Sequence, residues 1–252
     1  MLIGFSTGTF HKFLDLYDSY EIIHDFLSEN KSPITIELSA LREKDFFLLL
    51  DFLRRFKEHD AYHSIHLPKV KFYDPQLILN ELATYYWYAI GRKEKINLIF
   101  HPNDYSPEVI ERTMKHRSIQ NNFYFCLENM DSGKSNSRTV EEFEETYLEY
   151  PEGTGVCIDI GHAFQVLKKE EKVLEFFDEN KPWYKYIKQV HLSWVNKFGD
   201  HCFMGESFIN ENKNVLSKIN VPIILELESS TSYMSTNLTH QFNLIKSIYT
   251  SI

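Results

Sequence analysis

Eight short runs of apolar and β-branched residues recur along the chain, and longer stretches with a helical pattern separate them. Successive runs begin roughly 30 residues apart, the length of a strand–helix unit that returns the chain to the same end of a sheet. Because eight such units close a parallel sheet on itself, the rhythm predicts a (β/α)8 barrel, the TIM barrel. The predicted strands cover residues 2–6, 34–38, 63–67, 96–101, 123–128, 155–160, 187–192 and 221–227.

Amphipathic segments between these strands predict the helices, over residues 45–58, 75–88, 108–115, 139–147 and 237–249. Ser106 and Pro107 form a helix start, and Thr139 with Glu142 matches the capping-box pattern. The 252 residues are close to the about 250 that one barrel needs, and no long linker divides them. We therefore predict one domain over residues 1–252. The rival fold is an open dinucleotide-binding sheet, but the chain lacks G-x-G-x-x-G after its first strand.

The acidic balance of the chain disfavours nucleic acid as its partner. There are 36 Asp and Glu residues against 27 Lys and Arg, which gives a net charge of −9, and there is no basic run. Three scattered cysteines are too few for a disulfide framework, and no stretch approaches the about 20 apolar residues of a membrane span. These features predict a cytoplasmic protein without a membrane segment. Its aromatic-rich helices are compatible with a homodimer interface.

Seven of the eight predicted strands end at an acidic residue or a histidine: Glu37, His66, His101, Glu128, Asp159, His191 and Glu226. In a barrel the carboxyl ends of all strands meet at one mouth, so residues far apart in sequence become neighbours. Several carboxylates there would repel one another unless a cation neutralises them. A mixture of histidine and carboxylate ligands is typical of Zn²⁺ or Mn²⁺. The sequence therefore predicts a divalent metal site at the mouth of the barrel.

The candidate site residues fall into two sets. The expected metal ligands are Glu128, Asp159, His191 and Glu226. The residues expected to add ligands or to contact the substrate are His66, His101, His162 and His201. For Glu37, a metal-binding role and a structural role are both open. The histidines expected at the surface or in packing are His11, His24, His59, His63, His116 and His240.

Two of the cysteines are expected beneath the metal. Side chains alternate along a strand, so Cys126 shares a face with Glu128, and Cys157 shares a face with Asp159. Both thiols should therefore fill the barrel interior as packing residues rather than as ligands.

Short motifs occur at most of the strand ends, and their order and spacing form one pattern. The most specific is GVCIDIGHAF at residues 155–164. The others are IFHP at 99–102, CLEN at 126–129, VHL at 190–192, HCFMGE at 201–206 and PIILE at 222–226. Together they resemble the xylose-isomerase-like barrels, which include endonuclease IV and many sugar isomerases and epimerases. The resemblance extends from the second predicted strand to the eighth, and it implies a common metal site at Glu128, Asp159, His191 and Glu226.

The resemblance implies two activities. A sugar isomerase or epimerase would use the metal to stabilise an enediolate of a small sugar-like substrate. Glu128 or Glu226 would then move the proton, and His66 or His162 would orient the hydroxyl groups. An endonuclease IV-like phosphodiesterase would hold up to three ions, with the four additional histidines completing a three-zinc cluster. A barrel that binds metal without catalysis is the third interpretation.

Departures from these relatives bear on the choice. The nuclease pattern Asp-x-His is broken because Gly199 stands two residues before His201, and residues 193–196 (SWVN) replace an Asp-Ser pair. In ketose 3-epimerases a second glutamate stands where this chain has Lys134, and an arginine stands where it has Lys197. With a net charge of −9, the sequence favours the isomerase or epimerase over the phosphodiesterase, and a small sugar-like molecule over nucleic acid.

Overall fold

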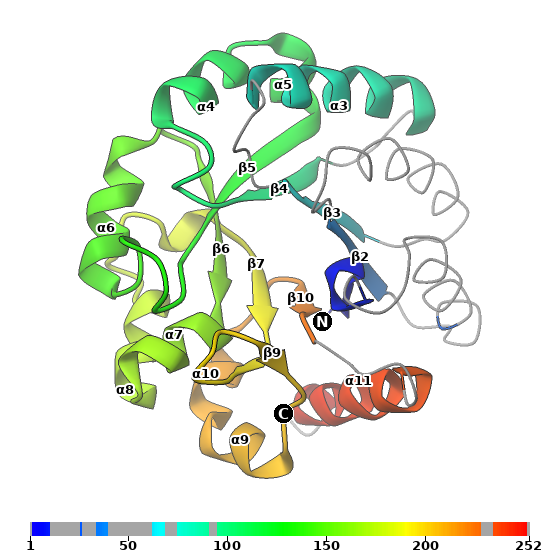
Figure 1. The fold of residues 1–252 in the computed structure, drawn as a ribbon, viewed down its shortest axis with the longest axis vertical. Helices are drawn as coiled ribbons and strands as arrows, with labels where there is room; N and C mark the ends of the chain where they lie inside the picture. Colours follow the sequence, from blue (N-terminus) through cyan, green and yellow to red (C-terminus); the bar gives the residue numbers. More distant parts are fainter. Residues whose placement is uncertain are drawn as a thin grey trace.

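The computed structural model describes residues 2–10, 26, 34–39, 62–68, 75–90, 95–227 and 234–250. Eight parallel strands form a closed barrel in the order β1-β10-β7-β6-β5-β4-β3-β2, and β1 pairs with β2 to complete the ring (Figure 1). The predicted (β/α)8 barrel is therefore confirmed. The predicted helix over residues 45–58 lies outside the described residues, and the assignment of the whole chain to one domain stays a prediction.

The barrel strands are β1 (Ile3–Ser6), β2 (Ile34–Ser39), β3 (Tyr62–His66), β4 (Ile96–Phe100), β5 (Phe123–Glu128), β6 (Gly155–Asp159), β7 (Ile187–Leu192) and β10 (Ile223–Leu225). A small antiparallel pair, β8 (Trp194–Val195) and β9 (His201–Cys202), follows β7. All eight predicted strands occur. Two have the predicted bounds, and the other six differ from the prediction by one or two residues at one or both ends. The sixth ends early because Asp159 caps the helix that begins at Ile160.

The described helices surround the barrel (Figure 1). They are α3 (Pro75–Ile90), α4 (Pro107–Met114), α5 (Arg117–Asn122), α6 (Val140–Glu149), α7 (Ile160–Leu167), α8 (Glu170–Leu174), α9 (Glu206–Glu211), α10 (Lys213–Lys218) and α11 (Met234–Thr250). Three 3-10 turns are η1 (Thr7–Phe10), η2 (Glu175–Phe177) and η3 (Tyr184–Tyr186). No described helix is both long enough and apolar enough to cross a membrane.

The predicted capping box is present in a modified form at the start of α6. The Thr139 hydroxyl accepts a hydrogen bond from the Glu142 backbone N–H at 3.2 Å, as the pattern predicts. The Glu142 carboxylate accepts from the backbone N–H of Arg138 at 3.0 Å and from the Arg138 guanidinium. The reciprocal bond therefore reaches one residue further back than in a standard box.

Two kinds of interior lie on the two faces of the barrel wall. Outside it, apolar side chains pack between strands and helices, and the buried Trp183 ring lies edge-on to Phe143 at 5.0 Å between centroids. Inside it, Ile99, Cys126 and Cys157 form a small separate apolar cluster. Both cysteines are fully buried, and burial raises the pKa of both thiols. They are packing residues, as predicted.

A register shift between β6 and β7 decides which residues meet at the mouth of the barrel. The pairing changes by one residue after Val156, so that Lys188 is skipped and Asp159 pairs with His191. In unbroken register Asp159 would pair with Val190, whose side chain belongs to the outer core. The irregularity therefore places an acidic residue and a histidine side by side on the inner face.

The backbones of β1 and β2 approach each other closely at Gly4. A Cβ atom on Gly4 would lie 1.5 Å from the backbone oxygen of Thr35 in the paired strand. We expect Gly4→Ala to lower the free energy of unfolding by about 3 kcal/mol, because the two backbones must separate. Gly205→Ala is the control, since its nearest neighbour is 3.8 Å away and it should cost under about 1 kcal/mol. Equal midpoints of chemical denaturation for the two variants would contradict this account.

Candidate metal centre

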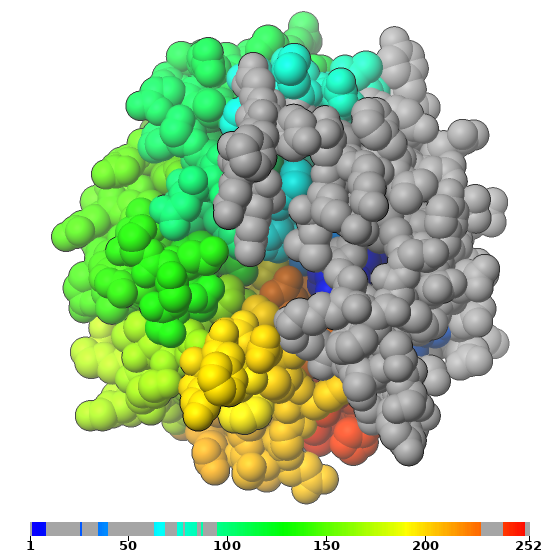
Figure 2. Space-filling view, viewed as in Figure 1, coloured from blue at the N-terminus to red at the C-terminus, as the bar shows by residue number. Residues whose placement is uncertain are grey.

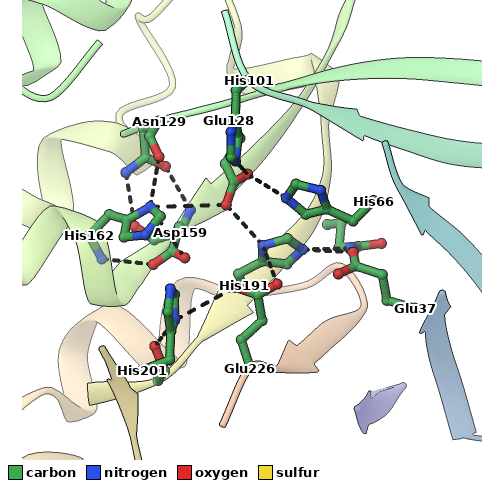
Figure 3. Close-up of polar contacts among 12 residues, drawn as sticks. Glu37, His66, His101, Glu128, Asn129, Asp159, His162, His191, His201 and Glu226 are labelled. Atoms are coloured by element: carbon green, nitrogen blue, oxygen red, sulfur yellow. Dashed lines mark hydrogen bonds and ion pairs between the residues drawn. The ribbon is translucent and has the colours of Figure 1, made fainter. Parts of the chain in front are cut away.

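The residues predicted at the strand ends converge on one site (Figure 3). Six of the eight candidates line a cavity of about 310 Å³: His66, His101, Glu128, His162, His201 and Glu226. The other two, Asp159 and His191, are fully buried beneath it. The barrel therefore brings all eight candidate residues together, although they span 161 positions of sequence, from His66 to Glu226.

The ligand atoms form three overlapping groups among the described residues. In each group, one nitrogen or oxygen atom per residue lies within 4.8 Å of all the others. The groups are His66, His101 and Glu128; Asp159, His162 and His201; and Glu128, Asp159, His191 and Glu226. Glu128 and Asp159 each belong to two groups, so each has the position of a carboxylate that can bridge neighbouring cations.

Glu128 is the centre of this arrangement. Its Oε2 lies 3.2 Å from Nε2 of His66 and 3.2 Å from Nε2 of His101. Its Oε1 lies 3.0 Å from Nδ1 of His191. The carboxylate is 1% exposed, so both of its oxygens are directed at histidines and neither faces open solvent.

Asn129 and the start of α7 orient Asp159. The Asn129 amide accepts from the Asp159 backbone N–H at 2.6 Å and donates to the Asp159 carbonyl at 2.9 Å. Asp159 Oδ1 accepts from the backbone N–H of His162 at 2.7 Å. Asp159 Oδ2 is buried and accepts no hydrogen bond from the described part of the chain, although Nδ1 of His162 lies 3.4 Å away. An oriented carboxylate with one unsatisfied oxygen is suited to a cation.

The rings of His66 and His101 are oriented by contacts of their Nδ1 atoms, on the side away from Glu128. Nδ1 of His66 lies 3.1 Å from the Leu67 carbonyl, and Nδ1 of His101 lies 3.3 Å from the Asp104 carboxylate. These bonds leave Nε2 of both rings facing Glu128. A hydrogen bond to one ring nitrogen fixes the orientation of the other, which is the usual support of a metal-binding histidine.

Glu37 lies behind His191. Its Oε2 is 2.8 Å from Nε2 of His191, and it also accepts from the Gln189 side chain at 2.7 Å and from Ser64 at 3.4 Å. Glu37 belongs to none of the ligand groups found among the described residues. Of the two roles that the sequence leaves open, the geometry supports the structural one, because Nδ1 of His191 faces Glu128 on the opposite side.

Burial and neighbouring charges shift the pKa values of Glu226 and Glu128 in opposite directions. Burial raises the pKa of Glu226 to about 8, and the carboxylates of Glu37, Glu128 and Asp159 add to the effect. Burial would also raise the pKa of Glu128, but the surrounding histidines, His191 first, hold it well below its usual range. Glu226 is therefore the carboxyl group whose charge most needs a neutralising cation.

The histidines respond to the same charges. Burial opposes protonation of His191, but the acidic groups around it raise its pKa well above the usual value. The pKa values of His66 and His101 are also raised despite burial, through Glu128 for the first ring and through Asp104 and Glu128 for the second. Burial lowers the pKa of His201 to about 4.

This donor set fits a divalent cation of the zinc or manganese type. It combines imidazole nitrogens with carboxylate oxygens, it contains the unsatisfied buried oxygen of Asp159, and it is supported from behind. A divalent cation would also remove the repulsion that raises the pKa of Glu226.

The histidines expected outside the site are divided between described and undescribed parts of the chain. His116 and His240 are exposed, and His63 is half-buried in β3. His11, His24 and His59 lie outside the described residues. The supporting residues to which the sequence analysis assigned no role are Asp104, Asn129, Gln189 and Ser193. The Ser193 hydroxyl lies 2.8 Å from Nδ1 of His201. The positions of two of these supporting residues in the sequence could have indicated their role. Asn129 directly follows the candidate ligand Glu128 at the end of β5, and Asp104 follows His101 by three residues.

No protein-family model and no curated protein sequence matches the chain. Solved structures match it over almost its whole length. A D-tagatose 3-epimerase-like protein has a TM-score of 0.62 at 17% identity, covering 100% of this chain and 98% of its own. The 3-keto-D-glucoside 4-epimerase YcjR from E. coli has a TM-score of 0.61 at 10% identity, with 98% and 99% covered. The structure of AsfvAP:AG has a TM-score of 0.59 at 16% identity, with 98% and 99% covered.

These similarities show that the chain shares the (β/α)8 barrel fold of the matched structures. The predicted resemblance is therefore confirmed at the level of fold. At these identities the likeness is one of architecture, so the assignment of a reaction depends on the residues of the site itself.

We expect the metal-free protein to lose stability as pH rises above about 6.5. His66, His101 and His191 have raised pKa values in the folded state, so their contribution is complete below their unfolded pKa and is lost as pH rises through the folded value. Glu226, raised to about 8, acts in the same direction. Thermal unfolding in excess EDTA should show a lower midpoint at pH 8.5 than at pH 6.5.

Added Zn²⁺ or Mn²⁺ should reverse this trend, because a metal binds the neutral imidazoles and ionised carboxylates that predominate at higher pH. A midpoint in EDTA that rises between pH 6.5 and pH 8.5, or one that metal leaves unchanged at both, would contradict the assignment of a metal centre.

Glu37→Gln should weaken metal binding without removing a ligand. Loss of a carboxylate behind a metal-binding histidine typically costs roughly 10- to 100-fold in metal affinity. Isothermal titration of Mn²⁺ or Zn²⁺ into the chelated protein measures this directly. Glu111→Gln is the matched control, because that exposed glutamate pairs only with Lys115 among the described residues and should leave the affinity unchanged. Equal affinities for wild type and Glu37→Gln would remove Glu37 from the metal centre.

Proposed function

We propose that this protein is a divalent-metal-dependent isomerase or epimerase of a small sugar-like substrate. One observation carries the proposal: the ligand group Glu128, Asp159, His191 and Glu226 lies at a cavity of about 310 Å³ in the mouth of the barrel. A cavity of this size is at the small end of ligand pockets, which suits a small polar molecule. The similarity in fold to sugar epimerases supports the same substrate class.

The chemistry that a divalent cation would supply here is polarisation of a substrate carbonyl, which makes the neighbouring C–H bond more acidic. The metal ligands of this proposal are Glu128, Asp159, His191 and Glu226, and the protein would hold one ion there. His66 and His162 line the same cavity and are placed to orient substrate hydroxyl groups.

Glu226 is the better of the two candidate bases. Both glutamates line the cavity, but the Glu226 side chain is 17% exposed, whereas Glu128 is 1% exposed and both of its oxygens lie near histidine nitrogens. A carboxylate held by three imidazoles is a weak base, as its lowered pKa indicates. We therefore assign to Glu226 the removal of a proton from one substrate carbon and its return, on the same face, to the neighbouring carbon, which is an isomerisation. Epimerisation would require a second proton donor on the opposite face of the substrate.

Hydrogen exchange tests this assignment. We expect the Mn²⁺-loaded protein, incubated in D₂O with a panel of ketoses and aldoses, to introduce deuterium beside the carbonyl of its substrate, as seen by proton NMR. Glu226→Gln should lower this rate by roughly 10²- to 10⁴-fold, the usual contribution of a general base. Glu111→Gln is the control, because it makes the same substitution at an exposed glutamate that pairs with Lys115 and lies outside the cavity lining. Exchange by Glu226→Gln at the wild-type rate would exclude Glu226 as the base.

A second function has one specific observation in its favour. The three overlapping ligand groups, joined through Glu128 and Asp159, offer positions for two or three ions rather than one. Adjacent cations that share carboxylates are suited to phosphodiester hydrolysis, because they can generate a hydroxide and neutralise the transition state. The net charge of −9 weighs against a nucleic-acid substrate. This endonuclease IV-like alternative is therefore the second candidate.

The number of bound ions separates the two candidates. We expect elemental analysis and anomalous scattering to find one tightly bound ion at the four-residue group. Two or three ions, together with cleavage of duplex DNA that contains an abasic site, would favour the phosphodiesterase. His101→Ala with His162→Ala should then abolish that cleavage, since each variant removes a ligand from one outer group. Bound metal without either activity would indicate a non-catalytic metal-binding barrel.

A further inference from the structure

Lys134 stands apart from the other lysines of the structure. Among the described half-buried lysines it alone has neither a carboxylate nor an aromatic ring as a partner. The partnered ones are Lys181 with Glu144 (2.7 Å), Lys95 and Lys188 over the ring of Tyr124 (4.6 and 5.0 Å) and Lys246 over the ring of Phe242 (5.6 Å). In a chain with a net charge of −9, an ammonium group that is partly withdrawn from water and still unpaired is an uncompensated cost.

Lys134 also lies in the wall of the candidate active site. It lines the same cavity as Glu226 and His162, and it is the one lysine or arginine among the described lining residues. Because that cavity measures about 310 Å³, one small molecule can contact Lys134 and the metal-binding end together. Asp131 lines the same cavity, but no ion pair joins it to Lys134, and its Oδ1 accepts a hydrogen bond from the Gly133 N–H at 2.6 Å. The positive charge of Lys134 is therefore unpaired within the described part of the protein.

The loop that carries Lys134 is fixed by hydrogen bonds. Its own N–H donates to the Asp131 carbonyl at 3.2 Å, and Met130 N–H donates to the Ser137 carbonyl at 2.8 Å. Ser132 N–H donates to the side chain of Gln165 at 2.9 Å, and Gln165 in turn donates to the Asn196 carbonyl beside β8. On the face in Figure 2, the green surface of this loop lies next to the yellow surface of the β8–β9 segment. The backbone at Lys134 is thus positioned at the cavity before any ligand binds.

We propose that Lys134 forms an anion subsite of this cavity, and that the natural substrate carries a carboxylate or a phosphate group. An anion restores to the ammonium the favourable interactions that burial removes, and charge-assisted hydrogen bonds are stronger than those to neutral hydroxyls. The inference rests on the proposed function, because it names the class of sugar derivative that the metal-dependent reaction accepts.

Three probes distinguish the sources of the anion: D-fructose, D-fructose 6-phosphate and D-glucuronate. Titration of each into the Mn²⁺-loaded protein should show at least one anionic sugar binding about tenfold or more tightly than D-fructose. Lys134→Gln should reduce this ratio to near one, and Lys134→Arg should retain much of it. Lys172→Gln, an exposed lysine paired with Glu175, is the control and should keep the wild-type ratio. Circular dichroism verifies that each variant is folded.

A wild-type ratio near one, or a ratio that Lys134→Gln leaves unchanged, would overturn the anion subsite. The preferred probe identifies the anion as phosphate or carboxylate. The binding ratio is independent of turnover, so the two proposals can fail separately. Exchange in D₂O without an anion preference would leave the isomerase standing and remove the subsite. An anion preference that depends on Lys134, with no exchange of any sugar, would support the anion subsite and remove the isomerase.

Discussion

The structure depends on how a buried barrel mouth holds four carboxyl groups close together. Glu37, Glu128, Asp159 and Glu226 would repel one another strongly in a medium that excludes water. His191 lies between two of them, with one ring nitrogen 2.8 Å from Glu37 and the other 3.0 Å from Glu128. The carboxyl groups raise the pKa of His66, His101 and His191, so protonation of these rings offsets the charge. In the proposed metal centre the same rings would be neutral and would face a cation instead.

The need to hold charged side chains inside the barrel explains why the inner and outer faces of the barrel wall differ. The outer layer buries large apolar side chains against the helices, which supplies most of the favourable free energy of folding. The inner face can then carry polar groups such as Ser64, Asn97 and Gln189, which are fully buried and hydrogen-bonded. The Ser64 hydroxyl and the Gln189 amide both donate to Oε2 of Glu37, although Oε1 of Glu37 and Oδ1 of Asn97 have no hydrogen-bond partner among the described residues. The two bonds to Oε2 orient Glu37, and through it the ring of His191.

The two proposed reactions would use the same arrangement of residues and would differ in the number of bound cations. A single ion at the four-residue group would leave the outer histidines free to contact a substrate. Further ions would convert the same histidines into ligands and would make Glu128 a bridge. The burial of Glu128 would suit a fixed ligand in either case, whereas the more exposed Glu226 would be able to exchange protons with a bound molecule. The choice between the two proposed reactions would thus depend on how many cations are bound rather than on a different fold.

Much of the fold and of the candidate site could be predicted from the sequence. The eight-fold repeat of strand and helix patterns is a local property, and it determines a parallel barrel without knowledge of any long-range contact. The same repeat identifies the residues at the strand ends, because the side-chain period of a strand fixes which of them share a face. The convergence of the two sets of candidate residues follows from closure of the barrel alone.

The features that depend on contacts between strands of the barrel were decided by the tertiary structure. The skipped residue in β7 that pairs Asp159 with His191 reflects the balance of many ladder hydrogen bonds, and no local pattern encodes it. Glu37 contacts His191 across 154 positions of sequence, so its role behind the ring could not be separated from that of a ligand beforehand. The position of Lys134 in the wall of the cavity, together with Glu226 and His162, likewise became clear only from the tertiary structure. The sequence determined which side chains reach the mouth of the barrel, and three-dimensional packing decided which of them face each other, because that depends on register and on closure of the ring.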